Sequence, residues 1–281
     1  QALLSSYRDL PCEEDRVGYG FNEMDGEFSG DYAIHYEGDA GLQQVGSQRS
    51  HFLFYRIESY EELTKRMEMT ADLSLGFSAF STDISARIYT NSFVSRFKQY
   101  IVVDLLIENA PRLIAGEKKF TSGARKKLGG KQKDFVEAYG TKYVIGKITG
   151  GRLYGIIDME AYTEKDYREL SLDIESSMGT WGDFEGSFKQ SISKFSEHCK
   201  LEIVLYKTGG TAGVPVTVEE FIGQVKGFPN EVKSNGWITH LLLSNYNGIE
   251  GYDFDSYRYM ARLDLANELL QKLALKYLQL K

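Results

Sequence analysis

The chain is poor in residues that would divide it into modules. Its 281 residues include only four prolines, and no stretch rich in proline, glycine and serine separates one part from another. No run of residues approaches the roughly 18 apolar side chains that a membrane-spanning helix needs. We therefore expect one domain over residues 1–281, a length that a single core can accommodate.

Histidine and cysteine are also scarce, and the few that occur do not cluster. The four histidines are scattered along the chain, at positions His35, His51, His198 and His240. The sequence has no Gly-x-Ser-x-Gly elbow, no phosphate-binding loop and no His-Glu-x-x-His motif. We therefore expect no enzyme, no cofactor and no metal site. Cys12 and Cys199 fit no metal-binding spacing, and the sequence leaves open whether they form a disulfide or stay free.

The charge balance is negative, with a net charge of −7. This balance does not favour nucleic acid as a partner. Hydrophobic residues make up 42% of the chain and charged residues 26%, which is ordinary for a soluble globular protein. The 19 tyrosines and 28 glycines suit a β-rich protein whose strands bend.

Residues 170–195 fit two periodicities. At helical spacing, large apolar side chains form one stripe, and at strand spacing they occupy even positions between polar odd ones. The expected turn is Gly179-Thr180-Trp181-Gly182-Asp183, and Trp181 is the large apolar residue out of step. Such a segment can form packed helices in one state and a two-faced β-hairpin in another, whereas the simpler alternative is amphipathic elements on a core. The candidate membrane-facing residues are Leu170, Leu172, Ile174, Met178, Trp181, Phe184, Phe188 and Ile192.

A stretch about a hundred residues earlier has the same property. Apolar side chains alternate with polar ones from Met67 to Ala79, and the alternation resumes from Ile84 to Ile88 after a polar turn. Each arm has roughly ten residues, the length that a tilted membrane-spanning strand needs. The candidate membrane-facing residues here are Leu73, Leu75, Phe77, Phe80, Ile84 and Ile88.

Other segments indicate long strands and a few helices. Strands are predicted at residues 51–56, 98–108, 142–160 and 200–208. Paired glycines occur within the third strand, Gly150-Gly151, and directly after the fourth, Gly209-Gly210, and such pairs mark bulges or sharp bends. Helices are predicted at residues 134–139, 218–226 and 255–281, the last one amphipathic.

The five residues Tyr139-Gly140-Thr141-Lys142-Tyr143 resemble the signature of the membrane-attack-complex/perforin (MACPF) family, Tyr-Gly-Thr/Ser-His-Phe/Tyr. Lys142 replaces the customary His, so four of the five positions match. A short helix leads into the motif and the strand with Gly150-Gly151 leaves it, as in the family. Val17 to Asn22 resembles the family's opening glycine-rich turn, and Ser59 to Leu63 resembles the entry to its first helical cluster.

This resemblance, which extends to the wider superfamily of MACPF proteins and cholesterol-dependent cytolysins, implies an α+β fold. Its centre would be a strongly bent, four-stranded antiparallel sheet flanked by two helical clusters, at residues 66–96 and 162–197. In the family these clusters convert to membrane-inserting β-hairpins. We expect the two glycine pairs to be bends that open as the sheet straightens.

The resemblance also implies a function. We expect a pore-forming protein that is secreted as a soluble monomer, binds a lipid membrane, and joins copies of itself in a ring. Each subunit would insert two β-hairpins into a large β-barrel pore. Two alternatives remain open: a non-lytic interaction or adhesion protein with this fold, and one component of a two-component pore that needs a separate membrane-binding partner protein.

Overall fold

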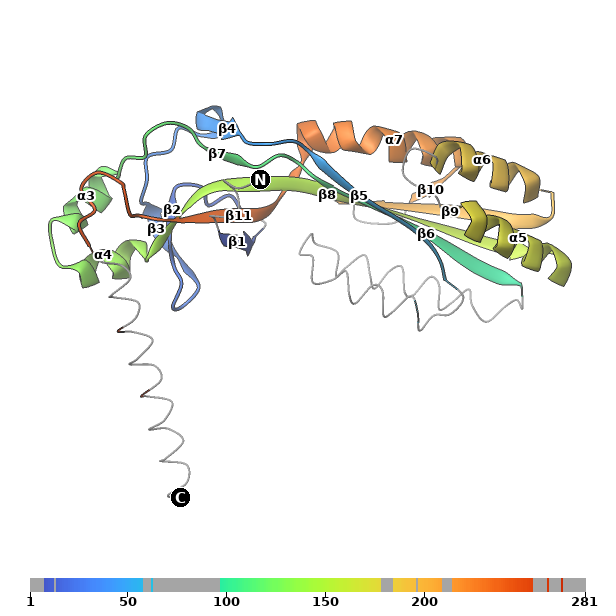
Figure 1. The fold of residues 1–281 in the computed structure, drawn as a ribbon, viewed down its shortest axis with the longest axis horizontal. Coiled ribbons are helices and arrows are strands. Elements are labelled where there is room, and N and C mark those ends of the chain that lie inside the picture. The colour runs from blue at the N-terminus through green and yellow to red at the C-terminus, as the bar shows by residue number, and fades with distance from the viewer. Residues whose placement is uncertain are drawn as a thin grey trace, which may run out of the picture.

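The computed structural model describes residues 8–12, 14–57, 62, 97–177, 184–195, 197–208, 214–254, 262 and 269. Within these residues the chain forms one large antiparallel sheet with α-helices packed on it (Figure 1). No helix in this part of the chain is long and apolar enough to cross a membrane. Residues 66–96 lie outside the described residues, as do all but Arg262 and Leu269 of the predicted helix 255–281.

The strands of the sheet differ widely in length. The long strands are β5 (Arg49–Ile57), β6 (Lys98–Glu108), β8 (Lys142–Ala161), β9 (Cys199–Lys207) and β11 (Trp237–Asn245). The short strands are β1 (Arg8–Pro11), β2 (Tyr19–Asn22), β3 (Glu27–Tyr32), β4 (Leu42–Gln44), β7 (Arg112–Ile114) and β10 (Val214–Val216). The strands predicted at residues 51–56, 98–108, 142–160 and 200–208 are therefore confirmed.

β8 is the central strand, because its two halves have different neighbours. Over its second half the order is β5-β6-β8-β9, with β10 on the outer edge of β9. Over its first half, β11 and β1 extend the sheet on one side, and β7, β4, β2 and β3 lie on the other. The predicted sheet of four strands is not confirmed, because eleven strands are joined among the described residues. Figure 1 shows β8 curving along its length.

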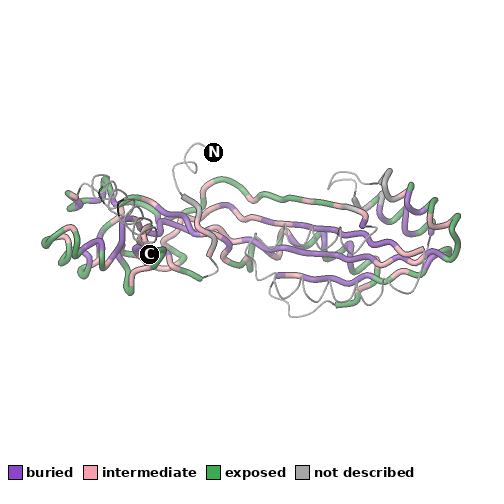
Figure 2. The backbone as a smooth tube through the Cα atoms, turned by 90° about the horizontal axis from the view of Figure 1, so that it is seen from below, coloured by how far each residue is buried: buried purple, intermediate pink, exposed green. Residues whose placement is uncertain are grey.

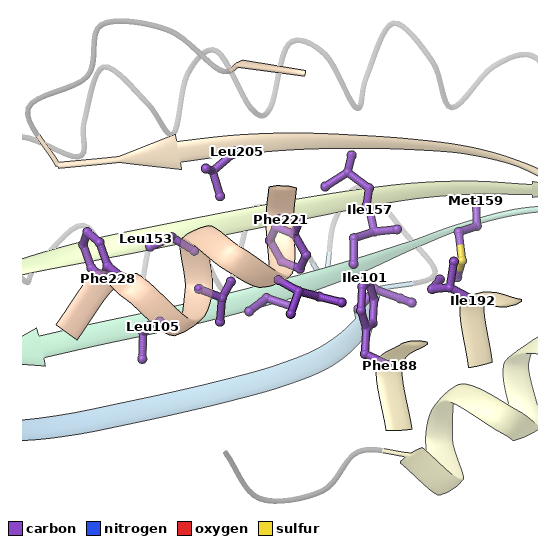
Figure 3. Packing of buried hydrophobic residues seen from close by; sticks show 14 of the residues in the cluster. Ile101, Leu105, Leu153, Ile157, Met159, Phe188, Ile192, Leu205, Phe221 and Phe228 are labelled. Carbon is purple, nitrogen blue, oxygen red and sulfur yellow. The ribbon is translucent and has the colours of Figure 1, made fainter. Parts of the chain in front are cut away.

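The second half of the sheet has two apolar faces. We call one the helical face, because α5 (Glu164–Ser177), α6 (Phe184–Phe195) and α7 (Val218–Asn235) pack on it. Its sheet residues include Ile101, Leu105, Leu153, Ile157 and Leu205 (Figure 3). We call the opposite one the tyrosine face, and its buried residues are Ile57, Tyr100, Val102, Tyr154, Ile156, Val204 and Tyr206. Figure 2 shows how continuous this burial is along the long strands.

A second core fills the other end of the sheet. It contains α3 (Ser122–Leu128) and α4 (Gln132–Tyr139), the latter confirming the helix predicted at 134–139. Aromatic rings dominate this core: Phe135 lies 5.8 Å from Phe120 and 5.2 Å from Tyr246, measured between ring centroids. The two cores fill opposite halves of one curved sheet. The boundary between these halves is therefore where we expect the sheet to bend.

α7 is longer than the predicted helix, which ended at residue 226. The helix begins with a capping box between Thr217 and Glu220 and continues through Pro229 to Asn235. A proline inside a helix costs about 3 kcal/mol. Phe228 and Val232, on either side of it, are fully buried against the sheet. Burial of two such side chains contributes about 1.5–3 kcal/mol each, which offsets the cost of the proline.

Candidate functional site

The signature residues join α4 to β8 and contact the opening glycine-rich turn directly. The Thr141 N–H donates to the Phe21 carbonyl oxygen at 3.0 Å. Gly140 has φ +71°, and a Cβ added there would lie 2.2 Å from the same carbonyl oxygen. At Gly20 an added Cβ would lie 2.0 Å from the Tyr139 carbonyl oxygen. Two backbones meet here at a distance that only glycine permits.

The remaining signature residues are held by side-chain contacts. The Tyr246 hydroxyl donates to the Tyr139 carbonyl oxygen at 2.7 Å, and its ring stacks on Tyr143 at 5.4 Å between centroids. Burial raises the pKa of Tyr246, so this hydroxyl stays protonated and remains a donor. The Lys142 Nζ lies 3.0 Å from the Glu23 Oε1, with both side chains largely buried. An ion pair therefore occupies the position at which the motif departs from its customary His.

Gly150 and Gly151 lie where β8 changes partners. Trp237 of β11 and Glu108 of β6 both pair with Gly150, from opposite sides. A Cβ added at Gly150 would lie 2.5 Å from the Ile107 carbonyl oxygen. The pair thus stands at the junction between the two halves of the sheet. Gly209 and Gly210 lie outside the described residues.

α7 rests on a row of glycines in β8. A Cβ added at Gly151 would lie 2.7 Å from Val232 Cγ2, and one added at Gly155 would lie 2.2 Å from Phe221 Cε2. Both glycines are on the helical face, separated by the buried Leu153. The missing side chains let the helix axis approach the strand closely, so α7 and β8 fit as a ridge and a groove.

A polar network fixes the second half of α7 at the bend. The Asn109 Nδ2 donates to the Val232 carbonyl oxygen at 2.8 Å and to the Thr149 Oγ1 at 2.9 Å. The Gln48 Nε2 donates to the Asn109 Oδ1 and to the Pro229 carbonyl oxygen, both at 2.8 Å. These contacts tie α7 to both halves of the sheet, beside a polar cavity of about 400 Å³.

The described part of the second cluster consists of α5 and α6 on the helical face. Leu170, Phe188 and Ile192 are buried there, as the helical stripe predicts. Leu172 differs, because 67% of it is exposed. The Lys194 Nζ of α6 donates to the Asp173 Oδ1 of α5 at 2.8 Å. The side chains of Ile174, Met178, Trp181 and Phe184 lie outside the described part, as do all six candidates of the first segment.

The tyrosine face carries charge as well as rings. The Arg152 guanidinium donates to both carboxylate oxygens of Asp104, at 2.8 and 2.5 Å, and both side chains are buried. Nearer the end of β8, burial raises the pKa of Asp158, and the Lys98 amine at 3.1 Å opposes this shift. Because burying a charge is costly, each of these side chains lies beside one of opposite charge.

The two cysteines are free thiols. The Cys12 N–H donates to the Thr239 carbonyl oxygen, and the Thr239 hydroxyl donates to the Ile148 carbonyl oxygen, so Cys12 lies beside the first half of β8. Cys199 pairs with Ala161 at the other end of the strand. About 40 Å of strand separates the two levels, whereas a disulfide needs Cα atoms within about 7 Å. This settles the question that the sequence left open.

Comparison with solved structures finds partial similarity to several larger proteins. With wild-type pneumolysin the identity is 11% and the TM-score 0.40, over 86% of this chain and 60% of that one. With stonustoxin the values are 10% and 0.38, over 86% and 32%. With a protein from Bacteroides thetaiotaomicron that has a MAC/Perforin domain they are 11% and 0.29, over 73% and 49%.

This chain spans less than two thirds of each of these three chains. No protein-family model and no curated protein matches the sequence. Because the TM-scores are low, we base the proposed function on the sequence and the strand register of this chain.

The described residues do not form a metal centre. No group of three or more His, Cys, Asp or Glu side chains in those ranges is arranged to hold a metal ion. What the site can do is mechanical: it holds α5, α6 and α7 against one face of a curved sheet. Sequence reasoning missed α7 as part of this site, although the spacing of Phe221, Val225, Phe228 and Val232 carries the signal.

Proposed function

We propose that this protein forms membrane pores. A soluble monomer would assemble with copies of itself on a membrane, and residues 66–96 and 162–197 would then extend as β-hairpins that complete a large β-barrel. The observation that carries the proposal is the agreement between the register of the long strands and the apolar positions of both segments.

The register of β8 and β9 supports a hairpin in the second segment. Ala161 pairs with Cys199, and one step further the Tyr162 N–H donates to the His198 carbonyl oxygen at 3.1 Å. If both strands continued in this register, they would meet at Thr180, inside the turn predicted from the sequence. Every large apolar candidate of the segment except Trp181, which belongs to the turn, would then lie on one face.

The register of β5 and β6 supports a hairpin in the first segment. Ile57 pairs with Tyr100, and continuing that register brings the two arms together between Ser78 and Ala79, a few residues before the polar turn expected from the sequence. All six apolar candidates would share one face. The residues facing each other across the arms would include Phe77 with Phe80, Leu73 with Ile84, and Ala71 with Ala86.

Both apolar rows would continue the same face of the sheet. The tyrosine face consists of odd positions in β5 and even positions in β6, β8 and β9, such as Ile57, Tyr100, Ile156 and Val204. The apolar rows have the same parity: odd in the first arm and even in the other three. A shift of one residue in any arm would have reversed its faces. Four strands therefore agree on which side would meet lipid.

The opposite rows would continue the helical face toward a water-filled lumen. Their side chains are mostly serine, aspartate, glutamate and lysine, among them Ser171, Asp173 and Lys189. A membrane β-barrel with a polar interior has this alternation.

Leu172 fits the strand periodicity of the second segment but not its helical periodicity. It lies off the buried stripe of α5, and a single exposed leucine is common on protein surfaces. Leu172 supports the strand pattern because, in that pattern, it lies between Leu170 and Ile174 in an unbroken apolar row on the lipid side. The strand pattern accounts for it, and the helix does not.

Backbone hydrogen bonding makes assembly necessary. In lipid every N–H and C=O needs a partner, so an open sheet edge is too costly. Two hairpins supply four strands, whereas barrels with an aqueous channel have about 16 or more, which requires roughly four subunits or more. Each apolar side chain taken from water contributes about 1.5–3 kcal/mol, so six or seven per hairpin supply on the order of ten kcal/mol.

The two tryptophans allow a direct test. Trp181 lies at the expected hairpin tip, and Trp237 pairs with Gly150 at the bend. In a Trp237→Phe variant on dye-loaded liposomes with brominated acyl chains, we expect dye release together with quenching of Trp181. A Trp181→Phe variant should also release dye, but the fluorescence of its remaining Trp237 should not be quenched. Electron microscopy of the liposomes should show rings.

Other results would point elsewhere. Dye release without quenching of Trp181 would contradict the hairpin mechanism. Membrane binding without dye release would favour a non-lytic interaction protein. Dye release that depends on an added second protein would favour a two-component pore.

A further inference from the structure

We propose that Lys194 exchanges one carboxylate partner for another when the second segment changes from helices to a hairpin, which presupposes the pore proposed above. In the helical state its partner is Asp173: the Lys194 Nζ donates to the Asp173 Oδ1 at 2.8 Å. This ion pair joins α6 to α5 across the helical face. Its two side chains are 55% and 29% exposed, so it is a contact at the rim of the packed pair.

The strand register assigns Lys194 a different partner in the hairpin. Ala161 pairs with Cys199, and the same register five residues further along each strand sets Asp166 opposite Lys194. Residues directly opposite on antiparallel strands have Cα atoms about 4.5–5.5 Å apart. Opposite charges in such a pair stabilise the sheet.

The two partners cannot serve Lys194 together. Asp166 and Asp173 are seven residues apart on α5, which is about 10 Å along a helix. In the helical state Asp166 has its own partners: its Oδ2 accepts from the Thr163 hydroxyl at 2.6 Å, and its Oδ1 lies 3.8 Å from the His198 Nδ1. The exchange therefore distinguishes the two states of the segment.

The place of the new pair explains a charge that would otherwise be misplaced. Lys194 lies on the lipid-side row, directly next to Ile192, and Asp166 precedes Leu170 on the facing arm. From Leu170 to the expected tip at Thr180 the arm has about the ten residues of a tilted membrane-spanning strand. Lys194 and Asp166 would thus lie at the border of the hydrocarbon, where each neutralises the other. Asp173 would turn to the lumen side.

Cysteine cross-linking tests the exchange. The variants carry Lys194→Cys with Asp166→Cys, in a background of Cys12→Ser and Cys199→Ser, and the assay scores the disulfide under mild oxidation. Two control pairs combine Lys194→Cys with Glu164→Cys or with Arg168→Cys, which lie on the same face two residues to either side. We expect the 166–194 disulfide to form in membrane-bound, dye-releasing protein and not in soluble protein. In the membrane-bound protein its yield should be at least several-fold higher than the yield of either control disulfide.

The outcomes separate this inference from the pore itself. Dye release with quenching of Trp181, but with the 164–194 or 168–194 disulfide dominant, would overturn the partner exchange and leave the pore standing. The same holds if soluble protein forms the 166–194 disulfide equally well. Absence of dye release and of quenching in the parent background would overturn both.

Charge reversal gives an independent measurement. Lys194→Asp should lower the rate of dye release several-fold and lower the thermal stability of the soluble protein slightly. Adding Asp166→Lys to this variant should restore dye release but not thermal stability. Adding Asp173→Lys instead should restore thermal stability but not dye release. Asp166→Lys alone controls for the loss of the Thr163 contact. Restoration of dye release by Asp173→Lys instead would contradict the exchange.

Discussion

Leu170 and Leu172 stand two residues apart on α5 and have opposite environments, one buried and one 67% exposed. Replacing Leu172 with arginine should leave the soluble protein within about 0.5 kcal/mol of its original stability, since an exposed site loses little. On the lipid face of a barrel an arginine costs about 2–4 kcal/mol near the midplane. We expect dye release from liposomes to fall at least tenfold while the melting temperature stays unchanged.

Glu169→Arg is the matched control for this variant. Glu169 is also exposed on α5, but its odd position belongs to the lumen-side row. We expect dye release to remain near the original rate. If both variants lost activity equally, or neither did, the assignment of faces would be wrong.

Gly140 gives a residue-scale prediction about the signature. Gly140→Ala must place a Cβ 2.2 Å from the Phe21 carbonyl oxygen at φ +71°, so the contact between the signature and the opening turn has to open. We expect a loss of at least about 2 kcal/mol in the free energy of unfolding, measured by denaturant titration. Gly26→Ala, at φ +76° with nothing within 4 Å, should cost only about 1 kcal/mol. Equal losses would mean that backbone strain, not the contact, governs both sites.

The sequence predicted the signature residues but not their contacts. Their positions follow from the motif alone, whereas the reason for Gly140 lies in Phe21, more than a hundred residues earlier in the chain. The Glu23 partner of Lys142 is equally remote. Such pairings arise from tertiary contact, and no local pattern encodes them.

At the scale of elements, the fit between α7 and β8 depends on glycine. Gly155→Ala would place a Cβ 2.2 Å from the Phe221 ring, which is fully buried and has no room to move aside. We expect the free energy of unfolding to fall by about 1–3 kcal/mol, as for other overpacked cores. The measurement is thermal or denaturant unfolding of the soluble protein.

Gly223→Ala is the control on the helix side of the same interface. Gly223 lies within α7 with nothing within 4 Å of an added Cβ. Alanine should stabilise the helix there by about 0.5–1 kcal/mol. A Gly155→Ala variant as stable as the original would show that α7 does not sit on the strand as closely as described.

The long strands were predictable because β6 and β8 are long runs rich in apolar and β-branched residues, as strands buried on both faces are. The end of α7 was not, because Pro229 is a stop signal in isolation and only the burial of Phe228 and Val232 overrides it. Most of the strands of three to six residues escaped prediction for a related reason. β4 and β7, for example, have three residues each, too few to show a period.

At the scale of the whole molecule, one property connects the sheet to the two segments: pleating is continuous along a strand. A residue's face in the sheet therefore fixes the face of every residue that extends the same strand. The tyrosine face and both apolar rows agree under this rule, although they were identified from different observations, one from burial and the others from sequence. This agreement favours a barrel wall built by extending β5, β6, β8 and β9 over any rearrangement that would separate them.

If the subunits of a ring share one barrel wall, a single inactive subunit should block insertion of the whole ring. If Leu172→Arg subunits still join rings but block insertion, an equal mixture with the original protein leaves at most about one ring in sixteen free of the variant, for rings of roughly four subunits or more. Dye release by the mixture should then fall far below half, at constant total protein. Mixing with Glu169→Arg should have no such effect. A mixture that retains half the activity would mean that each subunit acts alone, which an unpaired sheet edge in lipid does not allow.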